Sequence, residues 1–313
     1  MRYVDLRRLS RRDTHVREQL RTGRLVRLAP EIAVPVAELH NQKPWERATT
    51  RAIAFAKAAD RAALCSLSAA RAHGLSVSSS SSVVELSYVN HLQAPPRKTW
   101  PENVRYRRSL VLPEEVVDLG GYRATTIPRT VLDVARYHGV EEGVVVMDSA
   151  IRDHGLRLEE LAQHLDNLGR ARGITQSRTA IGLATGLAES PLESLARVKL
   201  LQWDNPLVRT VQEQVEVVLP DGTRVRLDLL INRWLVGELD GEFKYDGETF
   251  GKPVDTVLRQ ERLRENAIQR QGYIVARFGW LDLQSNGAGP CNFLKTVGEL
   301  LDRYGPDGPG VVA

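Results

Sequence analysis

Three acidic residues interrupt apolar segments in the last third of the chain. Asp228 stands within VRLDLL, and Glu238 and Asp240 stand within WLVGELD. Both segments are typical of strands, where aspartate and glutamate are depleted, so acids at these positions call for an explanation. A hard divalent cation such as Mg²⁺ or Mn²⁺ prefers carboxylate oxygens, and it can activate water and stabilise a leaving oxygen. The residue types therefore indicate metal-assisted hydrolysis as the candidate chemistry.

The spacing of these acids determines which of them can act together. If a turn at residues 231–232 joins the two segments as antiparallel neighbours, Asp228 and Glu238 lie on one face of the sheet. The alternative is a solvated strand surface without a metal, and Asp240 could equally cap the Asp-Gly turn that it begins. We expect metal binding for Asp228 and Glu238, and both interpretations stay open for Asp240.

Glu193 offers a third carboxylate, placed on a helix. It follows Ser190 by three residues, with Pro191 at the first helical position, which is a capping-box spacing. A structural capping role explains Glu193 fully on its own. The other interpretation is that Glu193 completes or orients a metal site with the two strand acids.

The elements around these residues predict a mixed sheet flanked by helices. The expected elements are a helix over 191–202, strands over 212–219, 223–230 and 233–240, a charged helix over about 254–270, a strand over 273–278 and a helix around 293–303. A Pro-Asp-Gly turn closes the first strand. The three consecutive strands form a meander that holds the acids on neighbouring strands.

Five ordered sequence blocks carry a resemblance to known nucleases. They are Glu189–Glu193, Arg226–Asp228, Val236–Tyr245, Glu261–Glu265 and Gly272–Arg277. The arrangement resembles the PD-(D/E)XK nuclease superfamily, and more closely its small Vsr-like domains. The resemblance implies a restriction-endonuclease-like fold that hydrolyses DNA phosphodiesters with Mg²⁺ or Mn²⁺. It also implies that Glu193, Asp228 and Glu238 bind the metal.

One position departs from the superfamily pattern. The lysine expected two residues after Glu238 is replaced by Asp240. Lys244 shares the parity of Glu238 if the strand continues through Gly241, and there it would orient the attacking water or offset charge on phosphate. If Gly241 ends the strand, this argument for Lys244 fails, and a scaffold without catalysis becomes the alternative. The candidate catalytic residues are Asp228, Glu238, Asp240 and Lys244, and the candidate phosphate contacts are Arg262, Arg264 and Arg277.

Positive charge is concentrated at the start of the chain. Residues 1–30 hold nine arginines against three acids, although the formal net charge of the whole chain is only +4. Such a segment attracts a polyanion, and a solvated basic surface is the alternative. A short helix, a second helix over 13–20 and a hairpin over 24–34 predict a reduced winged helix. Its candidate DNA contacts are Arg17, Arg24 and Arg27.

The first half of the chain carries a second resemblance. Gly23–Leu28 resembles the winged helix of AbiEi-type antitoxins, and Leu67–Leu75 and Ile127–Asp133 resemble the domain that follows it. In this middle segment we expect an alanine-rich helix over about 45–63 and strands over 83–88, 104–107 and 122–126. The resemblance implies a DNA-directed protein of a defence, toxin–antitoxin or mobile-element system.

The chain is therefore expected to be an α/β multidomain protein. Its parts are a winged-helix-like segment at 1–40, an α/β middle domain at 41–188 and a nuclease-like domain at 189–313. The expected function is that of a metal-dependent DNA endonuclease. The alternative is a non-enzymatic DNA-binding transcriptional regulator of the antitoxin type, in which the nuclease fold is degenerate. DNA is the expected partner, with a cognate toxin or a second copy of the chain as further candidates.

The composition is that of an ordinary soluble protein, with 42% hydrophobic and 26% charged residues. No stretch approaches the ~18 apolar residues of a membrane helix, and the N-terminus lacks the apolar core of a secretory signal. Cys65 and Cys291 fit no CxxC pattern, so neither a disulfide framework nor a zinc site is indicated. These features predict a cytoplasmic protein that does not engage a membrane.

Overall fold

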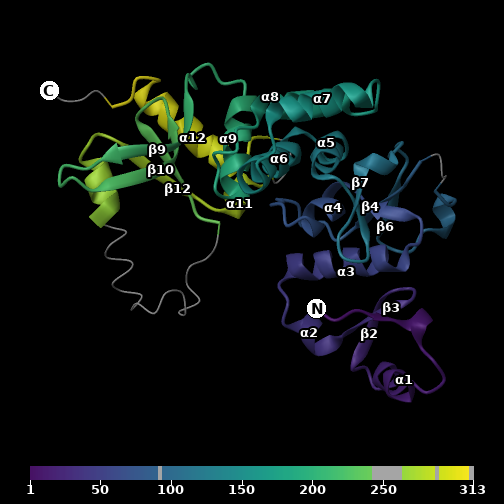
Figure 1. Ribbon diagram of the computed structural model, residues 1–313. Helices are drawn as coiled ribbons and strands as arrows, with labels where there is room; N and C mark the ends of the chain where they lie inside the picture. Colours follow the sequence, from purple (N-terminus) through teal and green to yellow (C-terminus); the bar gives the residue numbers. More distant parts are fainter. Residues whose placement is uncertain (91–93, 242–262, 286–288, 310–313) are drawn as a thin grey trace. The chain divides into compact units, whose positions relative to one another are not determined.

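The computed structural model describes residues 1–90, 94–241, 263–285 and 289–309. The chain forms mixed α/β structure in two compact units, Met1–Gly182 and Leu183–Ala313 (Figure 1). The boundary expected after residue 188 thus lies a few residues inside the second unit, and the one expected after residue 40 lies within the first. Among the described residues, we find no helix with both the length and the apolar character that crossing a bilayer requires.

The first unit begins with a small antiparallel sheet. Helix α1 (Thr14–Arg21) leads into the hairpin of β2 (Leu25–Ala29) and β3 (Ile32–Pro35), and β1 (Val4–Asp5) pairs with the other edge of β3. The helix and the hairpin occur in the expected order. The short helix expected in the first segment forms as the 3-10 helix Leu6–Arg8, and the structure adds the strand β1 before it. The strand forms because its valine packs against the small core that α1, β2 and β3 share.

A five-stranded mixed sheet forms the centre of the first unit, with the strand order β6-β5-β4-β8-β7. The strands are β4 (Ala62–Leu64), β5 (Val84–Tyr88), β6 (Val104–Arg107), β7 (Val116–Asp118) and β8 (Arg123–Thr125). The helix expected to reach about residue 63 ends earlier, since α3 (Pro44–Ala58) is followed by a break and then by β4. The residues of β4 are buried on both faces, and their Ala-Ala-Leu sequence carries no alternation that separates a strand from a helix.

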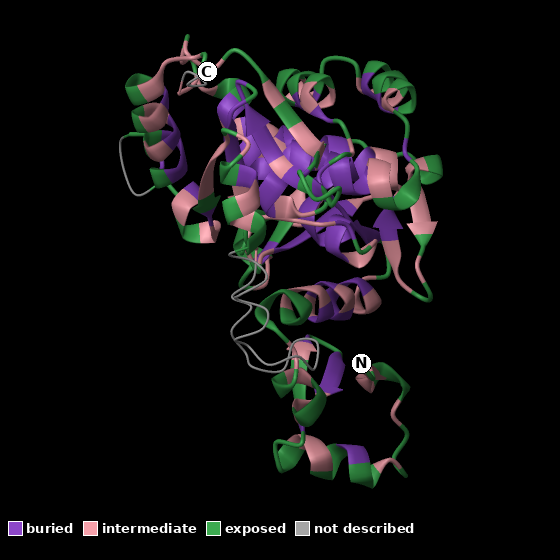
Figure 2. Cartoon of the chain, turned by 90° about the vertical axis from the view of Figure 1, so that its left-hand side faces the viewer, coloured by how far each residue is buried: buried purple, intermediate pink, exposed green. Residues whose placement is uncertain are grey.

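Besides α3, five helices follow or flank this sheet. They are α4 (Ser66–Ala72), α5 (Ile127–His138), α6 (Val140–His154), α7 (Leu158–Leu168) and α8 (Ile174–Leu183). Helix α6 approaches α5 closely at Gly143, where a Cβ atom would lie 2.5 Å from the Cβ of Ala135. Buried residues concentrate in α4, α5, α6 and the central sheet, whereas the N-terminal elements are mostly exposed or intermediate (Figure 2).

The second unit is a four-stranded mixed sheet flanked by helices, as the sequence predicts. Its strand order is β12-β11-β10-β9, with β11 and β12 parallel and the other neighbours antiparallel. The elements are α9 (Pro191–Gln202), β9 (Val211–Val218), β10 (Arg224–Ile231), β11 (Leu235–Leu239), helical residues 263–269, β12 (Ile274–Phe278), α11 (Trp280–Leu283) and α12 (Asn292–Tyr304).

The turn between β10 and β11 sets the register of the two acid-bearing strands. Asn232 and Arg233 have φ values of 51° and 67°, and the Trp234 N–H donates to the Ile231 carbonyl over 3.2 Å. Two successive left-handed residues define a type I′ turn, whose twist matches that of the flanking strands. The Asn232 side chain accepts hydrogen bonds from the N–H groups of residues 209 and 210, which stabilises this conformation.

Candidate active site

Asp228 and Glu238 occupy opposing positions on β10 and β11. The strands pair with Leu229 opposite Gly237, so the next pair along the same register is Asp228 and Glu238. The Leu239 N–H donates a 2.8 Å hydrogen bond to Asp228 Oδ2. Opposing residues of antiparallel strands share a face, so the two carboxylates lie together on one face, as the sequence predicts.

The surroundings of this pair disfavour its ionised form. Burial raises the pKa of Asp228 above its ordinary value, and the nearby carboxylates of Glu193 and Asp240 raise it further, while the Leu239 N–H and Arg264 oppose the shift. Burial likewise raises the pKa of Glu238, opposed by Arg264 and Arg277 and reinforced by Asp228 and Asp240. Negative charge gathered at a half-buried site is unfavourable until a cation offsets it.

The Glu193 side chain is held in place by hydrogen bonds from the backbone before α9 and from β9. Ser190 Oγ accepts the Glu193 N–H over 3.2 Å and caps α9. The buried Glu193 carboxylate accepts the Glu189 N–H over 2.9 Å and the Gln214 side-chain amide over 2.6 Å. Of the two hydrogen bonds of the expected capping box, only the one to Ser190 Oγ forms. The Glu193 carboxylate accepts the Glu189 N–H instead of the Ser190 N–H.

Gln214 is a site residue that the sequence analysis does not identify. Its φ of 50° breaks the regular alternation of side chains along β9. The side chains of two consecutive residues therefore both reach α9. Glu213 bonds Arg197 over 2.8 Å, and Gln214 bonds Glu193, whereas alternating side chains of a regular strand point to opposite faces. The Gln214 Oε1 atom is buried and has no hydrogen-bond partner among the described residues. The signal in the sequence is the polar run Gln-Glu-Gln, which breaks the alternation of β9.

Two of the arginines expected to contact phosphate lie beside the carboxylates and are paired with acids. Arg264 contacts Glu238 over 3.4 Å and donates to the Arg226 carbonyl over 2.8 Å. Arg277 is the register partner of Glu238 on β12 and contacts Glu265 over 3.1 Å. With the exposed Asp240 they line a small cavity of about 60 Å³. Lys244 and Arg262 lie outside the described residues.

The carboxylates of this site fit a hard cation that takes only one or two of its ligands from the protein. Among the described residues, no three or more histidine, cysteine, aspartate or glutamate side chains are arranged to hold one ion. The expected metal role of Glu193 stays a prediction: its charge raises the pKa of Asp228, and its carboxylate accepts hydrogen bonds from the N–H of residue 189 and from Gln214. Mg²⁺ commonly binds through one or two protein carboxylates, waters and substrate phosphate oxygens. The opposed Asp228 and Glu238 supply that chemistry.

The candidate DNA contacts of the first unit are exposed. Arg17 lies on α1, Arg24 directly precedes β2, and Arg27 lies on β2. The Arg17 guanidinium donates to the carbonyls of Ser10 and Arg11. Not all of the basic segment is available to a polyanion, since nearby arginines are paired with acids, as in the contact of Arg7 with Asp5.

Comparison with known proteins adds no assignment: no family model matches the chain, and no curated protein matches it.

Proposed function

We propose that the second unit is a metal-dependent DNA endonuclease that hydrolyses phosphodiester bonds. The observation that carries this proposal is the pair of Asp228 and Glu238 on neighbouring strands, where burial and nearby carboxylates raise the pKa of both side chains. In a purely structural pair of acids, hydrogen-bond donors and arginines would be expected to outweigh burial and to favour the charged form, whereas here burial and nearby carboxylates outweigh them. In a cation site without its cation, the charged form of the carboxylates is instead disfavoured.

Each neighbouring residue has a separate role in this proposal. Asp228 and Glu238 would hold Mg²⁺ or Mn²⁺, which when bound would supply a more acidic water and offset charge on the phosphate. The Leu239 N–H fixes the orientation of Asp228. Glu193, whose charge raises the pKa of Asp228 and whose carboxylate accepts the Gln214 amide, would complete or orient the site. Asp240, at the exposed end of β11, adds negative charge to the site.

The positive charge that the superfamily obtains from lysine has two candidate sources here. Lys244 is the residue proposed from sequence parity, and it would orient the attacking water. Arg264 is already 3.4 Å from Glu238 and could offset charge developing on phosphate from that position. Arg277 and Arg262 are then the remaining candidates for phosphate contacts.

DNA engagement would use the N-terminal unit as well. Arg17, Arg24 and Arg27 are exposed on the helix and hairpin of a winged-helix-like segment, which suits backbone contacts on a duplex. With the AbiEi-like resemblance, this supports a role in a defence, toxin–antitoxin or mobile-element context. A cognate toxin or a second copy of the chain remains the candidate protein partner.

A DNA-binding regulator with a degenerate nuclease fold is the second candidate function. Asp240 at the expected lysine position and the absence of a three-ligand metal group among the described residues favour it. The retained pair of strand carboxylates favours the enzyme. The two functions differ in whether the carboxylate pair is needed for anything beyond folding.

Nicking of supercoiled plasmid distinguishes the two functions. The nuclease predicts nicking by the full-length protein with Mg²⁺ or Mn²⁺, and loss of nicking in Asp228→Ala. Asp302→Asn is the matched control, because Asp302 is an exposed acid on α12 in the same unit. Equal nicking by Asp228→Ala and Asp302→Asn would assign the activity to a contaminant or another site. No nicking by the wild type with either metal would favour the regulator.

A further inference from the structure

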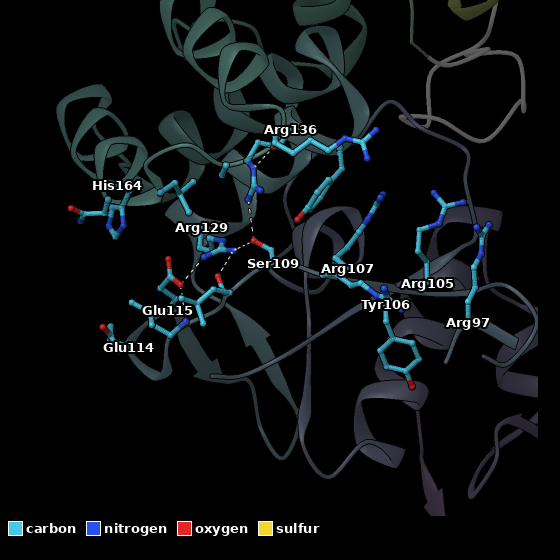
Figure 3. Close-up of a pocket in the computed structure, with 18 of the residues that line it drawn as sticks. Arg97, Arg105, Tyr106, Arg107, Ser109, Glu114, Glu115, Arg129, Arg136 and His164 are labelled. Atoms are coloured by element: carbon cyan, nitrogen blue, oxygen red, sulfur yellow. Dashed lines mark hydrogen bonds and ion pairs between the residues drawn. The ribbon is translucent and has the colours of Figure 1, made fainter. Parts of the chain in front are cut away.

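The first unit contains a large open cavity, which we call the arginine cleft. Its volume is about 1220 Å³. It is lined by β6 and the segment after it, by the 3-10 turn Arg97–Thr99, by α5, and by the end of α7 with the residues that follow (Figure 3). Many of its lining residues are arginines that lie far apart in the sequence, so only the folded chain brings them together.

Three inner arginines of the cleft are fixed by acids that are buried or half-buried. Arg129 bonds Glu115 over 2.6 Å and Asp133 over 2.9 Å, and Arg136 bonds Asp133 over 2.5 Å. Arg107 pairs with the buried Glu85. Their charges are therefore compensated within the protein, and their main effect is to make the wall of the cleft rigid.

Four outer arginines of the cleft are not compensated in this way. Arg97, Arg105, Arg108 and Arg172 are exposed, and none of their guanidinium groups has a hydrogen-bond or ion-pair partner within the described parts of the chain. The acids that line the cleft are Glu114 and Glu115, and Glu115 already bonds Arg129. The mouth of the cleft thus carries an excess of positive charge, which attracts a polyanion.

The arginine side chains of β6 point to one side of the strand. Figure 3 shows Arg105 and Arg107 pointing to one side of the strand and Tyr106 to the other, as alternation along a strand requires. Tyr106 is held there by stacking on Tyr88 and by an edge contact with Trp100. These ring contacts fix the strand that presents Arg105.

We propose that the arginine cleft binds a single-stranded segment of nucleic acid through its phosphates. A volume of about 1220 Å³ exceeds the roughly 300–1,000 Å³ of a typical small-molecule pocket, which favours an extended ligand. A positively charged groove that tracks the backbone is the usual means of binding a single strand, and arginine forks match phosphate oxygens. Reading the base sequence of a duplex instead needs an element that projects into its groove. The proposal does not depend on the carboxylate pair of the second unit.

Salt-dependent binding of a fluorescent oligothymidylate tests this proposal. The full-length protein is titrated in EDTA, so that cleavage cannot contribute. The quantity measured is the magnitude of the slope of log affinity against log salt, called the slope below. Each lost phosphate contact on a single strand lowers the slope by about 0.7. Arg97→Ala with Arg105→Ala should therefore lower it by about 1.4. Lysine at both positions should retain most of the slope, because the charge is kept.

The matched control is Arg61→Ala with Arg178→Ala, since both arginines are exposed in the same unit and lie outside the cleft. An unchanged slope in the cleft variant, or an equal decrease in the control, would overturn the proposal. So would equally tight competition by a duplex of the same length, by a nucleoside triphosphate or by polyglutamate. These competitors would indicate a duplex, a small phosphate ligand or an acidic protein partner instead.

Discussion

Asp228 lies opposite Glu238 across β10 and β11, and a 2.8 Å hydrogen bond from the Leu239 N–H holds Asp228 in place. Two carboxylates on one half-buried face repel each other and lose hydration, so their ionised forms destabilise the folded chain. Functional sites commonly carry such destabilisation, because the groups are arranged for a ligand rather than for each other. This property of the pair can be measured without any assay of activity.

Asp228→Asn should stabilise the metal-free protein at neutral pH. The pKa of Asp228 is raised in the fold, chiefly by burial, so the folded chain retains a proton to higher pH than the unfolded chain. Stability is therefore lost as pH rises through the raised pKa. We expect a gain of about 0.5–2 kcal/mol in the free energy of unfolding at pH 7, which disappears below the ordinary aspartate pKa near ~4. Urea denaturation across pH measures this gain, and Asp302→Asn should show none. A loss of stability at neutral pH would show that the pair is structural.

Variants of Glu193 and Ser190 distinguish a role in positioning the site from a role in capping α9. Ser190→Ala removes only the cap of α9 and should lower stability by about 1 kcal/mol, with plasmid nicking per folded molecule unchanged. Glu193→Ala should lower stability as well, since it leaves the Gln214 amide and the Glu189 N–H unpaired. It should also reduce nicking per folded molecule. If nicking per folded molecule stays at the wild-type value, Glu193 is a capping residue alone.

Lys244 and Arg264 are compared as sources of positive charge. Lys244→Ala should lower the turnover by about 10²-fold while DNA affinity changes little, because the ammonium acts mainly in the transition state. Lys244 lies outside the described residues, so this prediction rests on strand parity. Full turnover in Lys244→Ala combined with loss in Arg264→Ala would transfer the role to Arg264, which is already 3.4 Å from Glu238.

The N-terminal arginines should contribute to duplex binding. Arg24→Ala with Arg27→Ala should lower the magnitude of the slope of log DNA affinity against log salt by about 1.8, at about 0.9 for each phosphate contact. Substitution is a sharper test than deletion of residues 1–40, because Ala29 and Ile32 belong to the core that α3 shares with the central sheet. Arg21→Ala is the control, since Glu18 already pairs with Arg21 over 2.7 Å. A slope equal to that of the wild type would remove this surface from the interface.

Much of the second unit could be predicted from its sequence. The alternation of β9 and β10 and the Pro-Asp-Gly turn between them define a hairpin, and β11 continues the meander. Since strand period and turn position fix which residues oppose each other, the shared face of Asp228 and Glu238 followed as well. These are local features, and local features are what a single sequence carries.

Other features depend on contacts that sequence patterns do not contain. The φ of 50° at Gln214 arises where β9 meets α9, so its link to Glu193 could not be read from spacing. Strand β4 is short and buried on both faces, and its alanines favour a helix. The arginine cleft joins residues from Arg97 to Arg172, which only tertiary structure brings together.

Binding of Mn²⁺ tests the central claim most directly, because it asks whether the opposed carboxylates form a cation site. The electron paramagnetic resonance signal of free Mn²⁺ is followed as the full-length protein is added. Saturable binding by the wild type and by Asp302→Asn, with loss of binding in both Asp228→Asn and Glu238→Gln, is the predicted result. Undiminished binding in those two variants, or no binding by the wild type at millimolar Mn²⁺, would contradict the assignment of this pair as a metal site.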